Sequence, residues 1–135
     1  MNYEGPAEHD DVTVTERGWA GHFICADRCL FRRNTLVEGN GDRVVISTVG
    51  SLRKPDGGAG IDTLGAGGRY FETMAFGASD DGEYVDADVG DQRDFNSPWQ
   101  ICAPRFKDLP AGVENDANQM HDTVVREFVN SMSMK

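Results

Sequence analysis

The sequence lacks any long hydrophobic run, and no apolar stretch approaches the ~18–20 residues that a membrane-spanning helix requires. Residues 1–11 are acidic and have neither a basic segment nor an apolar core, so their composition is not that of a secretory signal peptide. Both absences lead us to expect a protein of the cytoplasm that has no membrane as a partner.

Cysteine is also scarce. The three cysteines, Cys25, Cys29 and Cys102, are an odd number without regular spacing, which argues against a disulfide scaffold and favours buried, reduced thiols. A structural zinc site needs four ligands, usually in closely spaced pairs. His22 lies near the pair Cys25 and Cys29, but the sequence offers no second pair, so we expect no bound metal and no cofactor.

Recognisable catalytic motifs are missing as well. There is no Gly-x-Ser-x-Gly elbow and no His-x-x-Glu-His arrangement, and the chain has only three histidines. The glycine-rich segment 55–68 lacks the third glycine of a dinucleotide-binding fingerprint and the Lys-Ser/Thr of a phosphate loop, and is either a lid over a ligand or a plain connector. Asp86, Asp88 and Asp91 lack EF-hand spacing and fit a solvated acidic strand edge better. We therefore expect no catalytic residues and a stoichiometric binding protein.

The charge is strongly negative but unevenly spread. A formal net charge of −10 argues against binding to a nucleic-acid polymer, because phosphate attraction needs a basic surface. Residues 17–54, however, hold seven basic against three acidic residues, whereas the rest of the chain holds six against twenty. A small basic region in an acidic protein favours a small anionic ligand. The alternative is that these arginines pair with acids elsewhere in the fold.

Short β-branched runs separated by glycine and turn residues predict an antiparallel sheet of about six strands. Asn40-Gly41 between two apolar runs predicts a hairpin. The expected strands cover residues 12–15, 22–25, 29–37, 43–49, 70–76, 84–89 and 99–102.

The C-terminal segment predicts one amphipathic helix, for which Asn115 or Asp116 is the expected cap. Its apolar stripe comprises Ala117, Met120, His121, Val124, Val125, Phe128 and Met132. Strands followed by one helix indicate an α+β class. We expect a flexible acidic tail at 1–11 and a single ligand-binding domain at 12–135.

Residues 16–36 interleave aromatic side chains with arginines. Arginine forks bind phosphate and aromatic rings stack on purines, so this composition favours a nucleotide-derived ligand. A core strand with arginines on its wet face is the alternative. In the same way, His121 on the apolar helix face is either a ligand contact or a hydrogen-bonded core residue.

Several motifs resemble the anti-Thoeris sponge proteins of phages, which bind the cyclic ADP-ribose signal made by bacterial immune TIR enzymes. The motifs lie at residues 16–23, 31–36, 47–50, 70–76, 86–89 and 120–121, and together span most of residues 16–132. The resemblance implies a homodimer or higher homo-oligomer, sites at subunit interfaces, and binding without cleavage. Some larger assemblies of the family also hold cyclic oligonucleotides.

We therefore expect a phage anti-defence protein that sequesters a cyclic nucleotide second messenger in the host cell cytoplasm. An enzyme that degrades such a messenger is one alternative, and an acidic DNA mimic that inhibits a host protein is another. Arg28, Arg33 and Arg53 are the expected phosphate contacts. The candidate ligand-binding residues, chosen on chemistry, are Phe23, Arg28, Arg33, Asn34, Thr35, Arg53, Tyr70, Phe76, Asn96, Trp99, Arg105 and His121.

Overall fold

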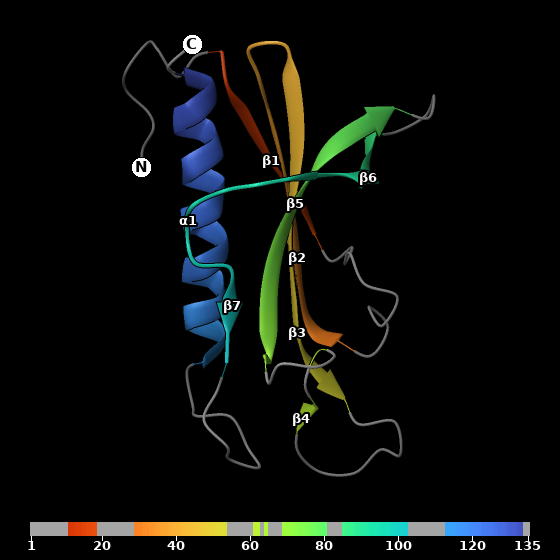
Figure 1. Cartoon of the computed structure of the whole chain (residues 1–135), viewed down its shortest axis with the longest axis vertical. Coiled ribbons are helices and arrows are strands. Elements are labelled where there is room, and N and C mark those ends of the chain that lie inside the picture. The colour runs from red at the N-terminus through yellow and green to blue at the C-terminus, as the bar shows by residue number, and fades with distance from the viewer. Residues whose placement is uncertain are drawn as a thin grey trace.

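The computed structural model describes residues 11–18, 29–53, 61–62, 64, 69–80, 85–102 and 113–133. Seven strands and one helix lie in these ranges (Figure 1): β1 Thr13–Gly18, β2 Cys29–Gly39, β3 Asp42–Arg53, β4 Ile61–Asp62, β5 Phe71–Asp80, β6 Val85–Arg93, β7 Gln100–Ile101 and α1 Val113–Ser133. The strands form one antiparallel sheet in the order β1-β2-β3-β5-β6, with β4 beside β3 and β7 beside β5. The predicted α+β class, an antiparallel sheet with a C-terminal helix, is confirmed.

The hairpin between β2 and β3 follows from its two turn residues. Asn40 and Gly41 both have positive φ angles, 52° and 79°, as the tightest hairpin turns require. Gly39 pairs with Asp42, so the loop contains only these two residues, and the register then runs back to Cys29 opposite Leu52. The hairpin predicted from Asn-Gly is confirmed, and its two long strands form the middle of the sheet.

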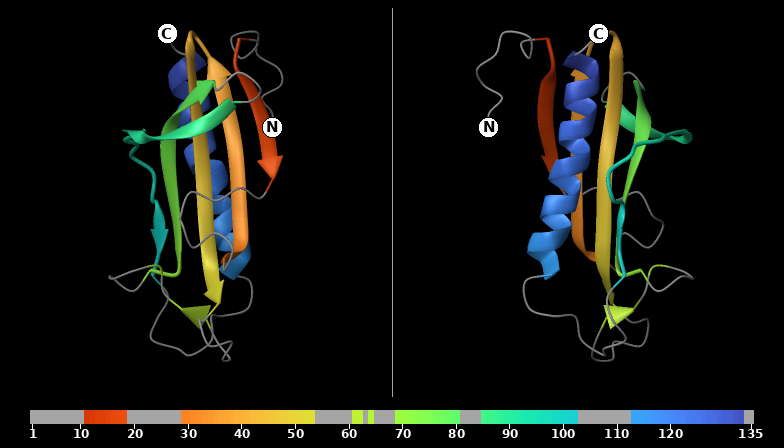
Figure 2. Two further views of the ribbon diagram at one scale, coloured as in Figure 1. Left: turned by 90° about the vertical axis from the view of Figure 1, so that its right-hand side faces the viewer. Right: turned by 60° about the vertical axis from the view of Figure 1, so that its left-hand side comes forward.

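The helix lies lengthwise along one face of the sheet, so the domain has two layers (Figures 1 and 2). Alternate residues of β2, β3 and β5 point toward it, because successive side chains of a strand face opposite sides. The main core cluster contains Val37, Val44, Ile46, Ala75, Val124, Val125, Val129 and Met132. Burying a valine, isoleucine or methionine side chain of this cluster stabilises the fold by roughly 1.5–3 kcal/mol, so these contacts hold α1 on the sheet.

Two details of the helix differ from the prediction. The helix begins at Val113, so Asn115 and Asp116 lie within its first turn and the expected cap position was wrong. Asp116 instead interacts favourably with the positive end of the helix dipole. Phe128 is only partly buried and packs edge-on against Phe95, with ring centroids 6.2 Å apart, while Val129 occupies the fully buried position.

The glycine-rich segment also contains more order than its composition suggests. Ile61 and Asp62 form the short strand β4, which pairs with the end of β3. Leu64 is buried against Cys29 and Val49. A glycine-rich composition does not favour a regular element, but at Ile61 and Asp62 the backbone pairing with β3 outweighs the low β-propensity of the surrounding residues. The strand expected at 22–25 and residues 1–10 of the expected tail lie outside the described residues.

After β6 the chain leaves the sheet, and residues 94–99 form a crossover that passes over to α1 and returns to β7 (Figure 1). On the helix, the Glu127 carboxylate accepts hydrogen bonds from the backbone N–H groups of Asn96 and Ser97, at 2.8 and 2.9 Å. On the return, the N–H of Thr73 donates to the carbonyl of Trp99 at 2.8 Å. This 94–99 crossover therefore ties the open edge of β5 to the helix. None of the described helices is long and apolar enough to cross a membrane.

Candidate ligand cavity

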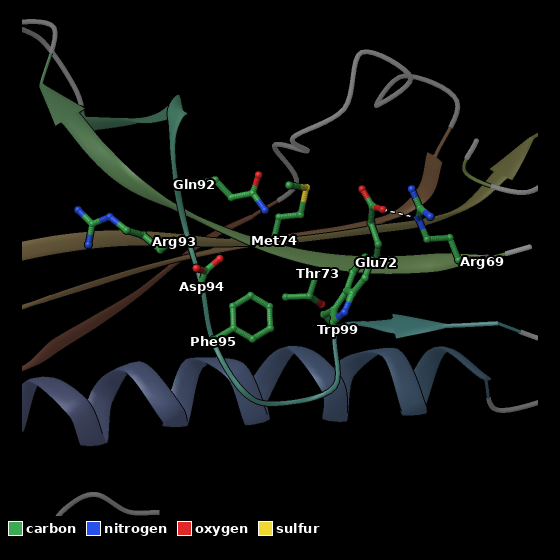
Figure 3. A pocket seen from close by; sticks show the side chains of 9 residues that line it. All are labelled: Arg69, Glu72, Thr73, Met74, Gln92, Arg93, Asp94, Phe95 and Trp99. Carbon is green, nitrogen blue, oxygen red and sulfur yellow. Dashed lines mark hydrogen bonds and ion pairs between the residues drawn. The ribbon is translucent and has the colours of Figure 1, made fainter. Parts of the chain in front are cut away.

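A cavity of about 480 Å³ lies where the crossover bows away from β5 (Figure 3). β6 pairs with β5 from Ala75 onward and β7 pairs at Phe71 and Glu72, so the edge of β5 is left open between them. The lining residues are Arg69, Glu72, Thr73, Met74, Gln92, Arg93, Asp94, Phe95 and Trp99. This volume falls within the range of about 300–1,000 Å³ that is usual for small-molecule sites.

Aromatic side chains form one part of the cavity wall. Trp99 lines the cavity and keeps 42% of its surface exposed. The guanidinium carbon of Arg69 lies 5.7 Å from the centre of its indole ring, a cation–π distance. Phe95 and Met74 add two further apolar groups (Figure 3). A planar ring entering the cavity therefore meets surfaces suited to stacking.

Charged groups form the rest of the wall, and they are paired with one another. Glu72 is buried, with 3% exposure, and accepts a 2.6 Å hydrogen bond from Arg69 Nε. Arg93 is held by Asp42, at 2.9 Å, and by Asp91, at 3.1 Å. The hydrogen bonds that Arg93 donates to these two carboxylates raise the pKa of Arg93 above its ordinary value. Both cavity arginines are thus already engaged by carboxylates.

A row of polar groups, buried except for Glu16 at its end, runs under the helix from the cavity wall to the opposite edge of the sheet. Thr73 Oγ1 lies 2.6 Å from Thr48 Oγ1, which lies 2.7 Å from His121 Nδ1. His121 Nε2 lies 2.7 Å from Thr35 Oγ1, and Thr35 donates to the carboxylate of Glu16 at 3.0 Å. We call these five residues the polar relay.

The carboxylate at one end fixes the direction of every proton in the polar relay. Thr35 has one hydroxyl proton and gives it to Glu16, so it accepts a bond from His121, whose Nε2 must carry the proton. The unprotonated Nδ1 then accepts from Thr48, which in turn accepts from Thr73. Burial, together with the positive charge of Arg33, lowers the pKa of His121 to about 3, so the neutral imidazole this pattern needs is the stable form.

Glu16 belongs to an ion-pair cluster at the edge of β1 and β2. Arg33 donates to Glu16 at 2.9 Å, to Asp122 at 2.8 Å and to Asn118 at 3.2 Å. Burial alone would raise the pKa of Glu16, but the hydrogen bond and charge of Arg33 outweigh it and lower the pKa below 4.5. A second cavity, of about 440 Å³, lies against this cluster and extends to Arg126.

The structure brings some of the candidate residues together and separates others. Arg33, Thr35 and His121 belong to the ion-pair cluster and the polar relay. Asn34 points to the opposite face of the sheet from Arg33 and Thr35, because it lies between them in β2, and it is buried there. His121 is a hydrogen-bonded core histidine, which was the alternative to a ligand contact. Arg33 is paired with acids, which was the alternative to a free basic site for an anionic ligand.

The remaining candidates are dispersed. Trp99 lines the cavity. Tyr70, just before β5, packs against the cluster of Phe71, Ala117 and Met120, and Phe76 is buried within β5. Asn96 lies in the crossover, at a shallow polar recess beside Glu127. Phe23, Arg28 and Arg105 lie outside the described residues, and for Arg53 only the backbone is described.

Sequence reasoning missed most of the cavity lining. Arg69, Glu72, Gln92, Arg93, Asp94 and Phe95 were not among the candidates. The alternation along the predicted strand 70–76 places Glu72 and Met74 on one face, but the two-residue strand β7 is what brings Trp99 close to them.

Among the described residues, no group of three or more histidine, cysteine, aspartate or glutamate side chains could hold a metal ion. Comparisons of the chain with protein-family models, with curated proteins and with solved structures found no match.

Proposed function

We propose that this protein binds a cyclic nucleotide second messenger of the cyclic ADP-ribose type and sequesters it, without cleavage, in the cytoplasm of a phage-infected cell. The observation that carries the proposal is the half-exposed Trp99 in the wall of a 480 Å³ cavity, where the hydrogen-bonding groups of Glu72 and Gln92 also lie. An aromatic platform beside polar groups suits a purine nucleotide. The sequence resemblance to the anti-Thoeris sponge proteins supports the same class of ligand.

The environment of His121 favours binding over turnover. A general base must reach the proton that it removes. His121 has no exposed surface, and both its ring nitrogens are engaged by Thr35 and Thr48. Thr73, which lines the cavity, carries a hydroxyl that is committed to Thr48. The described part of the cavity thus contains groups that bind a ligand, but no imidazole positioned to attack it.

Sequestration requires tight binding, because each site removes one ligand molecule. Nanomolar affinity corresponds to about −12 kcal/mol. Stacking of a base on an aromatic side chain contributes about 1–3 kcal/mol, and a hydrogen bond to a charged group about 1.5–3 kcal/mol. Trp99 alone is therefore insufficient, and the charged lining must supply most of the affinity.

Tryptophan fluorescence offers a direct test, because Trp99 lines the cavity and the chain has one other tryptophan, Trp19, which lies outside the described residues. The Trp19→Phe variant makes Trp99 the sole tryptophan. Cyclic ADP-ribose should quench its emission to a stoichiometric endpoint, and Trp99→Ala should weaken binding by about tenfold or more. Calorimetry on the Trp19→Phe and Trp99→Ala variants gives the matched comparison.

The fate of the ligand separates a sponge from an enzyme. After overnight incubation with substoichiometric protein and heat denaturation, chromatography should recover the messenger intact. Conversion of more ligand than there are sites would replace the proposal with a degrading enzyme, and absence of binding in calorimetry would end it.

A homo-oligomer is part of the proposal, as the family resemblance implies. Leu30, 63% exposed, and Val14, 36% exposed, are large apolar side chains at the β1–β2 side of the sheet that a subunit contact would cover. Light scattering at micromolar concentration should give at least twice the chain mass of 14.8 kDa. A monomer mass would remove this part of the proposal.

A further inference from the structure

The charges around the cavity do not favour a phosphate inside it. Arg69 and Arg93 line the wall together with two acids, Glu72 and Asp94. Arg93 is additionally paired with Asp42 and Asp91, which are not among the lining residues. Acidic groups therefore outnumber basic ones among these neighbours. A phosphate would have to share each arginine with a carboxylate and would lie close to that carboxylate, which is a like-charge contact.

The same groups suit a neutral ligand that carries hydrogen-bond donors. An ionised carboxylate can accept about four hydrogen bonds, so an ion-paired one keeps capacity for more. Ribose hydroxyls and an exocyclic amine are donors, and Glu72, Asp94 and the amide of Gln92 are acceptors at the wall (Figure 3). Trp99 and Phe95 supply the stacking surfaces for a base.

We propose that this cavity binds the nucleoside part of the ligand, the base with its ribose, and leaves the phosphates outside. This inference rests on the proposed function and makes it more specific. Glu72 is the main acceptor because it is the most deeply buried of the charged groups at the wall, with 3% exposure. A buried carboxylate is worth more to a donor than one in water, because the local dielectric is lower.

The test titrates adenosine, which has no phosphate, into the Trp19→Phe variant and follows Trp99 emission. Adenosine should quench Trp99, and its affinity should change by less than about twofold between 50 and 500 mM NaCl, because a neutral ligand is little affected by screening. Inorganic pyrophosphate should not displace it.

Two variants with the same change in charge provide the matched control. Glu72→Gln and Asp91→Asn each remove one negative charge, but Asp91 contacts Arg93 from outside the cavity lining. Glu72→Gln should weaken adenosine binding by about tenfold, whereas Asp91→Asn should leave it unchanged. Asp94→Asn, at an exposed position, serves as a second lining variant if Glu72→Gln unfolds, and should weaken binding by at least about threefold.

The outcomes distinguish this inference from the proposed function. If cyclic ADP-ribose binds but adenosine does not, or if pyrophosphate displaces adenosine, the nucleoside assignment is wrong and the proposed function stands. Tighter adenosine binding by both Glu72→Gln and Asp91→Asn would also overturn it. If adenosine binds and the messenger does not, the assignment stands and the proposed function fails. If neither ligand binds, both fail.

Discussion

Acidification should destabilise the fold through His121. Burial and the charge of Arg33 lower its pKa from 6.5 to about 3 in the folded protein, whereas the unfolded chain keeps the ordinary value. Between these two values the unfolded state binds one proton more than the folded state. The contribution of His121 to stability is therefore fully present above pH 6.5 and is lost as the pH falls toward 3.

The size of the effect follows from the two pKa values. One pH unit within this window is worth at most about 1.4 kcal/mol for a single group. Between pH 7 and pH 5, the His121 contribution to the free energy of unfolding should fall by about 2 kcal/mol. Glu16, whose pKa is lowered from 4.5, adds a loss of the same sign, but mainly below pH 5. The window from pH 7 to pH 5 therefore isolates the histidine.

Urea unfolding of the parent and of a His121→Asn variant at pH 7 and pH 5 measures how much unfolding free energy each chain loses on acidification. The difference between the two losses belongs to His121, since all other carboxylates and histidines are common to both chains. The parent should lose about 2 kcal/mol more than the variant on going from pH 7 to pH 5. NMR of the parent's imidazole nitrogens should show a neutral ring protonated at Nε2 throughout. Equal pH slopes for the two chains, or titration of His121 near pH 6.5, would refute the polar relay as described.

Three further predictions concern packing and the crossover. Val129→Ala should lower the free energy of unfolding by about 2 kcal/mol in urea titrations, and an unchanged midpoint would mean that α1 is not packed as described. Gly50→Ala should cost at least about 1–3 kcal/mol, because its Cβ would lie 2.2 Å from the ring of Phe71, and a parent-like melting temperature would contradict that contact. Glu127→Gln weakens the charge-assisted bonds to the 96–97 amides, so their hydrogen exchange should accelerate by about tenfold, and unchanged protection would show that the carboxylate does not anchor the crossover.

Much of the fold could be predicted because the relevant signals are local. Asn40-Gly41 specifies its turn through the backbone angles of those two residues. The helix follows from apolar residues at a spacing of 3.6. The predicted apolar stripe differs from the structure at one position. Phe128 is only partly buried, because it packs against Phe95 at the margin of the core, while its neighbour Val129, which the prediction left out, is fully buried.

The cavity could not be predicted because it depends on a non-local arrangement. Trp99 was chosen for its chemistry, but its neighbours come from β5 and from the end of β6. The two-residue pairing of β7 that joins them has no distinctive pattern in the sequence. Adjacency in the sequence can also mislead. Residues 33–35 are consecutive and were all chosen as candidates, but side chains alternate along a strand, so Asn34 lies on one face of the sheet and Arg33 and Thr35 lie on the other.

The crossover gives the cavity a thermodynamic link to the whole fold. Its residues provide one wall of the cavity through Asp94, Phe95 and Trp99, and the same stretch is anchored to the helix by Glu127. Opening that wall means releasing the helix contact, so an occupied cavity opposes both events. A ligand present at a hundred times its dissociation constant adds about 2.7 kcal/mol to the free energy of unfolding. Occupancy should consequently slow amide exchange in α1, well beyond the residues that the ligand touches.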